Sequence, residues 1–167
     1  VVGIIAIFLL RLSSVINDWL VLHSFSTERE MVQNRSAGTG FVVGGMTVAT
    51  GLMISGVMEG QSANYLSLLR DIAVYWVVGQ AILVLDGIVF QAITSYDVHD
   101  VIEKDKNVAA GISFAGFLVA QGVIVRTAVV GAGSDIGTEI LISVVIAICG
   151  LILLVIGRVI ADRVFLP

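Results

Sequence analysis

Five long apolar runs constrain this chain more than any other feature of its sequence. They cover residues 1–22, 37–58, 71–96, 109–130 and 139–165. A helix needs roughly 20 apolar residues to cross the hydrocarbon core of a bilayer, and each run is at least about that long. Backbone amides must be paired inside lipid, and the runs are too long and too apolar for barrel strands. We therefore predict an all-α fold, a polytopic transmembrane helical bundle of about five membrane-spanning helices.

Composition agrees with a membrane protein and excludes several other classes. The chain is 57% hydrophobic and only 13% charged, whereas a soluble domain is nearer one quarter charged. Its formal net charge is −4 and it has no basic tract, which argues against a nucleic-acid partner. Cys149 is the single cysteine, so no intrachain disulfide can form. The expected partners are the lipid bilayer and other membrane subunits or further copies of the chain.

The positions of lysine and arginine predict an orientation in the membrane. The connectors 23–36 and 97–108 and the end of the last run hold most of these cations: Arg29, Arg35, Lys104, Lys106 and Arg163. Loops on the other side hold Arg70, and Arg126 lies close to that membrane surface. Because cytoplasmic loops carry the excess of lysine and arginine, we predict that connectors 23–36 and 97–108 are cytoplasmic.

One phrase occurs twice in the chain and predicts internal repeats. Residues 30–43 read EMVQNRSAGTGFVV and residues 103–116 read EKDKNVAAGISFAG, and both keep E-x-x-x-N-x-x-A-G followed three residues later by Phe. We predict parallel two-helix repeats at 1–60 and 69–133, with 139–167 as the first helix of a third. We expect either that the natural chain continues or that this last helix closes the bundle.

The repeated phrase also predicts how the helices pack. We expect Asn34 and Asn107 to be helix N-caps. The shared positions are Glu30, Asn34, Ala37, Gly38, Glu103, Asn107, Ala110 and Gly111, and further small residues follow at Gly40, Gly44, Gly45, Ala49, Ala115, Gly116 and Ala120. Small residues at helical spacing let backbones approach closely, so the second helix of each repeat should be a packed inner helix. The alternative is a glycine-lined pathway or ligand cleft with both asparagines at its mouth.

The second copy of the phrase resembles a known family. The residues that carry the resemblance are Tyr96, Glu103, Asn107, Ala110, Gly111, Phe114 and Gly116, and together they resemble the YjfL-like bacterial inner-membrane proteins. The similarity covers nearly the whole chain and is strongest over 96–122. In the first copy His23 replaces Tyr96 and Val43 replaces Gly116. The resemblance implies a multi-pass protein of the bacterial cytoplasmic membrane, of unknown function and with no established catalytic residue.

Three ionisable residues fall inside apolar runs and form the candidate site. Arg11, Asp86 and Arg158 are each seven or eight residues beyond a glycine, which predicts a cluster of charges at one depth. Such residues cost a few kcal/mol in the bilayer and often mark function. We expect Asp86 to form a structural ion pair with Arg11 or Arg158. Proton or ion passage and a neutral, hydrogen-bonded Asp86 are the alternatives, and Arg158 can also pair with Asp162 one turn on.

No catalytic, metal or cofactor site is predicted. The segment DVHDVIEKDK at 97–106 contains His99 and Glu103, but a metal site usually needs three ligands in fixed geometry. We expect a solvated surface helix here, with His99 in solvent. Patterns for nucleophilic or metalloprotease catalysis do not occur. The predicted function is a non-enzymatic subunit of a membrane complex. The alternative is a small ion, proton or solute transporter that uses the three intramembrane charges.

Overall fold

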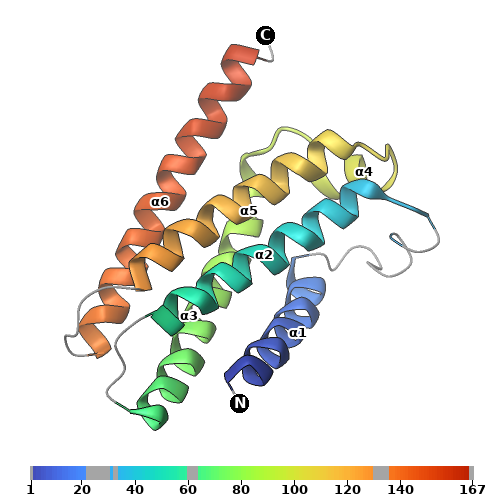
Figure 1. Cartoon of the computed structure of the whole chain (residues 1–167). Coiled ribbons are helices and arrows are strands. Elements are labelled where there is room, and N and C mark those ends of the chain that lie inside the picture. Colours follow the sequence, from blue (N-terminus) through green and yellow to red (C-terminus); the bar gives the residue numbers. More distant parts are fainter. Residues whose placement is uncertain (1, 22–30, 32–33, 60–63, 130–135, 166–167) are drawn as a thin grey trace.

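The computed structural model describes residues 2–21, 31, 34–59, 64–129 and 136–165. Its helices are α1 (Val2–Leu20), α2 (Ala37–Glu59), α3 (Tyr65–Ile93), the short α4 (Val98–Glu103), α5 (Val108–Val129) and α6 (Ile136–Phe165) (Figure 1). Five of these are long and apolar enough to cross a membrane. The described ranges contain no strand. The prediction of an all-α bundle of about five spanning helices is therefore confirmed.

One spanning helix begins well before the position predicted from its apolar run. Helix α3 begins at Tyr65 rather than near residue 71 because Asn64 and Ser67 form a capping box. The Asn64 Oδ1 atom accepts from the Ser67 amide at 2.9 Å, and the Ser67 hydroxyl oxygen accepts from the Asn64 amide at 3.1 Å. Helix α4 lies in the connector 97–108, where no spanning helix was predicted. Glu30, predicted as part of the repeated phrase, lies outside the described residues.

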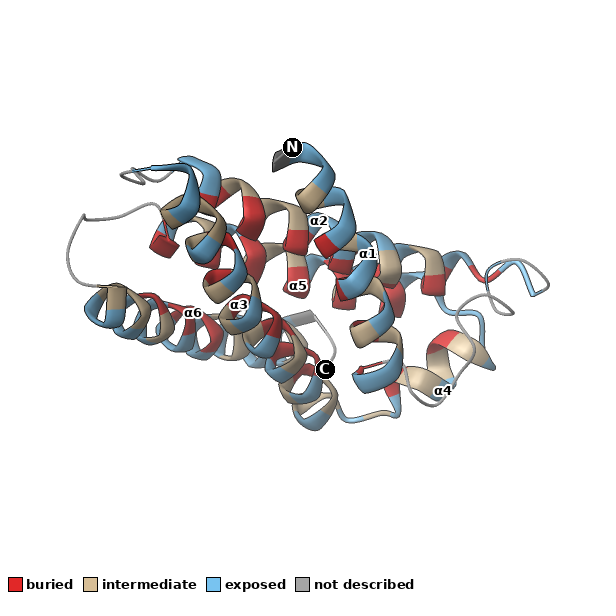
Figure 2. Ribbon diagram, turned by 90° about the horizontal axis from the view of Figure 1, so that it is seen from below, coloured by how far each residue is buried: buried red, intermediate tan, exposed pale blue. Residues whose placement is uncertain are grey.

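Helices α2 and α5 lie side by side at the centre of the bundle and run in the same direction (Figure 1). Helix α3 packs against both of them on one side. Helix α1 packs on α2 and α3, and α6 packs on α5 and α3. Figure 2 shows buried residues along the inner faces of this arrangement, whereas α1 and α6 are mostly exposed or intermediate. In a membrane those outer faces contact lipid, so their apolar side chains need no protein cover.

The interface between α2 and α5 is built from residues with little or no side chain. A Cβ atom added to Gly45 would lie 2.8 Å from the Ala115 Cα, and one added to Gly122 would lie 2.7 Å from the Ala49 Cα. A Cβ on Gly111 would overlap the carbonyl oxygen of Gly38. Real Cβ atoms essentially never come this close to backbone, so the two helices touch backbone to backbone over most of their length.

The register of this interface matches the spacing of the repeated phrase. Gly38 faces Gly111 and Ala49 faces Gly122, and both pairs are separated by 73 residues, the same offset as the two copies of the phrase. Equivalent positions therefore meet across the interface, as they do in two parallel helices related by a two-fold axis. The division of the chain into two-helix repeats stays a prediction, and this register agrees with it.

Several small residues do not lie in that interface. A Cβ atom added to Gly40, Gly44 or Gly116 would have no atom within 4 Å, and Ala120 is half-buried. The expectation that all the small residues pack between helices is therefore wrong for the three glycines. The reason is rotation along the helix, since consecutive residues such as Gly44 and Gly45 point about 100° apart.

The two inner helices begin in the same way, although not with the same residue type. Asn107 caps α5, because its Oδ1 atom accepts from the Ala110 amide at 3.2 Å. In α2 the cap is Ser36, whose hydroxyl oxygen accepts from the Thr39 amide at 3.4 Å. Asn34 lies two residues earlier, so its predicted N-cap role is wrong. Each cap follows a cation with a left-handed backbone, φ being 50° at Arg35 and 52° at Lys106.

Removing either cap should destabilise the protein by a similar amount. Ser36→Ala and Asn107→Ala are each expected to lower the free energy of unfolding by about 1 kcal/mol, because one helix amide loses its acceptor. Reversible unfolding in mixed SDS–detergent micelles measures this. Asn107→Ser, which keeps a capping oxygen, is the control and should stay near the parent. Equal stability of Asn107→Ala and Asn107→Ser would contradict the assignment.

Candidate functional site

Asp86 is the one member of the predicted charge cluster that lies fully inside the protein. Its exposed fraction is 0%, and it shares a face of α3 with the buried residues Leu83 and Phe90. Neither carboxylate oxygen has a hydrogen-bond partner among the described residues. Within the same ranges Asp86 also forms no ion pair, so the predicted pairing with Arg11 or Arg158 is wrong.

Two hydrogen bonds set the register of α1 against α3. The Trp76 indole Nε1 donates to the Ser13 hydroxyl at 2.8 Å. One turn further along both helices, the Gln80 Nε2 donates to the Asn17 Oδ1 at 2.6 Å. Because both pairs advance together, α1 and α3 run in the same direction.

This register separates Arg11 from Asp86. Since Ser13 lies beside Trp76, Arg11 is level with about residue 74 of α3. That position is about twelve residues from Asp86, or roughly 18 Å along the helix axis. The part of α3 at the level of Arg11 contains Tyr75, whose hydroxyl donates a hydrogen bond to Glu139 at 3.1 Å. The two charges are therefore not at one depth, and Arg11 is exposed on α1.

Arg158 lies closer to Asp86 but is engaged by other groups. Its Nη1 donates to the Ser113 hydroxyl at 2.7 Å, and its Nε lies 3.2 Å from the Asp162 carboxylate. Its guanidinium carbon is 5.4 Å from the centre of the Phe90 ring, within the range of a cation–π contact. The pairing with Asp162, considered as an alternative from the sequence, is the one that the structure contains.

Buried polar groups lie on both α1 and α2, and those on α1 were not anticipated from the sequence. Ser13 and Asn17 are buried and bind α3, and Thr50 of α2 is buried with no hydrogen-bond partner for its hydroxyl among the described residues. The available signal was the polar group SSxxND within the first apolar run, at residues 13–18. Its members recur at a spacing of four, which places them on one helix face.

His99 joins the connector to the end of α1. Its Nε2 lies 2.9 Å from the carbonyl oxygen of Val21, and this nitrogen must carry the proton because a carbonyl only accepts. The bond satisfies a carbonyl that the end of a helix leaves unpaired. The His99 side chain is only 12% exposed, so the prediction of a solvated histidine is wrong.

The charged groups of α4 stabilise that short helix. Asp97 is its N-cap, and the backbone hydrogen bond from Asp100 lowers the pKa of the Asp97 carboxyl. Lys104 bonds the Asp100 carboxylate at 2.7 Å, which raises the pKa of the lysine. The part of the chain that the structure describes holds no group of three or more His, Cys, Asp or Glu residues that could bind a metal ion.

Comparison with known proteins identifies the family. Residues 63–167, well over half of the chain, match the family described as Domain of Unknown Function (DUF350). No curated protein and no solved structure matches the chain. The matched range contains α3 to α6, and with them Asp86, Arg158 and the second copy of the repeated phrase. This multi-pass membrane protein belongs to the DUF350 family.

Proposed function

We propose that the chain is a non-enzymatic subunit of the bacterial inner membrane, of the YjfL-like kind, which assembles with a second copy of itself. The observation that carries this proposal is an apolar groove of about 510 Å³ lined by residues of α2 and α5, the two helices that lie side by side in front of α3 in Figure 1. Its floor contains Gly40, Gly44 and Gly116, and its sides include Phe41 and Ile112. We call this surface the α2/α5 groove.

The α2/α5 groove has the properties of a helix-packing surface in lipid. Lipid tails are as apolar as leucine, so membrane helices associate through close packing and not through the hydrophobic effect. The open glycines of the groove allow another backbone to approach, as the same kind of residue already does between α2 and α5. Phe41, Val48 and Ile112 are each about half exposed and form ridges beside the floor.

A second copy is the occupant that fits this surface best. Ridges and a glycine floor occur together on one patch, so a two-fold pairing lets each ridge pack on the floor of the other copy. The described residues that line the groove are all uncharged, so recognition needs no oppositely charged partner. The subunit proposal also includes cytoplasmic connectors at 23–36 and 97–108, supported by the excess of lysine and arginine there.

Filling the groove should separate the copies without unfolding the chain. Gly44→Leu places a side chain in open space within one copy and blocks the floor against the partner. Native mass spectrometry from detergent micelles should show a dimer for the parent and a monomer for Gly44→Leu. Gly157→Leu on α6, also in open space but outside the groove, is the control and should remain dimeric. A parent mass of one copy would contradict self-assembly, and a dimer in all three proteins would show that the copies associate through another surface. A second mass from another protein or a lipid would identify a different occupant of the groove.

Transport is the second candidate function, and one observation favours it. Asp86 is a buried ionisable group with no partner among the described residues, as proton-carrying carboxyl groups in membranes can be. Arg11 is exposed on α1, and Arg158 contacts Ser113 and Asp162. Proton passage would therefore depend on Asp86 alone. Liposomes that contain the parent would then conduct protons faster than liposomes that contain Asp86→Asn. The subunit proposal expects both to behave like empty liposomes.

A further inference from the structure

Asp86 on α3 and Gln121 on α5 each lie one helical turn beyond a ring contact that joins these two helices. The Phe90 ring stacks on the Phe114 ring with centroids 4.7 Å apart, and it meets the Phe117 ring edge-on at 5.2 Å. Asp86 is four residues before Phe90, and Gln121 is four residues after Phe117, which places each on the same helix face as its ring. The exposed fraction of both residues is 0%.

The two turns lead in the same direction because α3 and α5 are antiparallel. Phe90 near the end of α3 contacts the first half of α5. Ile72 near the start of α3 shares a buried cluster with Val125 near the end of α5. Asp86 and Gln121 are therefore at the same level of the bundle, on the faces that α3 and α5 turn toward each other.

Both groups present oxygen atoms that lack a hydrogen-bond donor. The Gln121 Nε2 donates to the Ala147 carbonyl of α6 at 2.9 Å, so its Oε1 is left to bind another group, and it has no partner among the described residues. Both carboxyl oxygens of Asp86 are in the same situation. Two acceptors do not bond each other, but a proton on the carboxyl group makes one of its oxygens a donor. One proton therefore converts the unmatched pair into a hydrogen bond.

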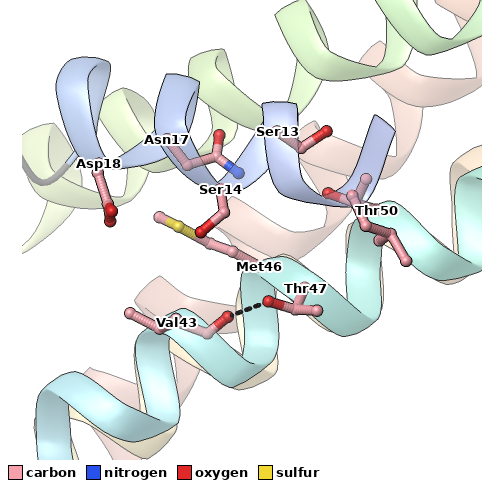
Figure 3. Close-up of a pocket in the computed structure, with 9 residues that line it drawn as sticks. Ser13, Ser14, Asn17, Asp18, Val43, Met46, Thr47 and Thr50 are labelled. Carbon is pink, nitrogen blue, oxygen red and sulfur yellow. Dashed lines mark hydrogen bonds between the residues drawn. The ribbon is translucent and has the colours of Figure 1, made fainter. Parts of the chain in front are cut away.

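Two other buried oxygens without partners belong to a different side of the bundle. Gln80 donates to Asn17 of α1 at 2.6 Å. Thr50 lines a cavity of about 10 Å³ between α1 and α2 together with Asn17 (Figure 3). Gln121 is instead bonded to α6, and it lies on the face of α5 that packs against Phe90. Gln121 is therefore the buried amide that is placed to receive a proton from Asp86.

Among the described residues no cationic side chain pairs with Asp86. Residues 37–58 of α2 and 108–125 of α5 contain no charged side chain. Arg11 lies at another level, and Arg158 is engaged by the two groups described above. An unpaired charge is costly within lipid, and a bound proton removes it without requiring a cavity.

We propose that Asp86 and Gln121 form a binding site for a single proton in the centre of the bundle. Asp86 takes up the proton, loses its negative charge and donates to the Gln121 Oε1. The Ala147 carbonyl holds the amide so that this oxygen faces α3, which makes Gln121 a positioning residue. The site depends neither on the proposed dimer nor on proton passage, because neither residue lines the α2/α5 groove and a bound proton need not move.

This bond is compatible with a carboxyl group that lowers stability. Only one of the two Asp86 oxygens gains a partner, so the other still lacks one among the described residues and costs stability. Leucine removes that oxygen and buries more apolar surface. Asp86→Leu should therefore still be more stable than the parent.

Infrared spectroscopy of the protein in liposomes at neutral pH tests the site. A protonated carboxyl group has a C=O stretching band separate from the bands of carboxylates and amides, and solvated acidic side chains are ionised at this pH. The parent should show this band, and Asp86→Asn should lose it. In Gln121→Leu the band should remain but shift to higher frequency, because the acid group no longer donates a hydrogen bond.

Gln80→Leu is the matched control for the Gln121 variant. Gln80 is also a buried glutamine whose Oε1 has no partner among the described residues, but it lies against α1, so its replacement should leave the band at the parent frequency. Gln121→Met, close in volume to glutamine, repeats the test if the leucine variant does not fold. The proposal is wrong if the parent has no band that Asp86→Asn removes, or if the band keeps its frequency without Gln121. An equal shift in Gln80→Leu would also contradict it.

Discussion

Gly111→Ala is expected to lower the free energy of unfolding by about 3 kcal/mol or more, although alanine is the better helix former. The added Cβ would overlap the carbonyl oxygen of Gly38, and backbone cannot rotate away as a side chain can. The helices α2 and α5 must therefore separate along their interface. Unfolding in mixed SDS–detergent micelles measures the loss.

The matched control for this variant is Gly116→Ala on the same helix. A Cβ atom at Gly116 meets nothing within 4 Å, so this variant should be as stable as the parent or up to about 1 kcal/mol more stable, through helix propensity alone. Similar stabilities for the two alanine variants would show that α2 and α5 do not pack as described.

Asp86→Leu is expected to raise the free energy of unfolding by about 1–3 kcal/mol. The Asp86 carboxyl group is buried without a hydrogen-bond partner among the described residues, and leucine removes the cost of keeping that group away from water. A paired Asp86 would behave in the opposite way, because breaking a buried ion pair costs roughly 3–5 kcal/mol. The sign of the change therefore separates the two arrangements.

A double-mutant cycle provides the control for Asp86. Arg158→Met removes the bonds to Ser113 and Asp162 and should destabilise the protein by itself. Combined with Asp86→Leu, it should show a coupling energy within about 0.5 kcal/mol of zero, as expected for residues without a shared interaction. A larger favourable coupling energy would show that Asp86 and Arg158 do form an ion pair, contrary to the arrangement described above.

The features that could be predicted from the sequence are those that depend on the length of an apolar run and on the size of its side chains. The apolar runs identified the five spanning helices of the described ranges. The small residues at Gly38, Gly45 and Gly111 indicated that α2 and α5 are packed inner helices, but not that these two helices contact each other. The start of α3 was missed because the capping box of Asn64 and Ser67 extends that helix into polar sequence.

The candidate site was harder to predict because it depends on register between helices. Counting from glycines placed Arg11 level with Asp86, but the bond between Ser13 and Trp76 slides α1 by about three turns. A single sequence also does not show which glycines face a neighbour. Gly44 and Gly45 are adjacent and identical, yet one is open and the other is packed.

The backbone contact between α2 and α5 has a consequence for any motion of the bundle. Helices this close have no side chains between them whose rearrangement could open a gap, so the central pair must move as one rigid unit. Helix α1 is held by a few polar bonds and by the tie from His99 to Val21. If a route through this protein opens, it opens where α1 swings away from the central pair.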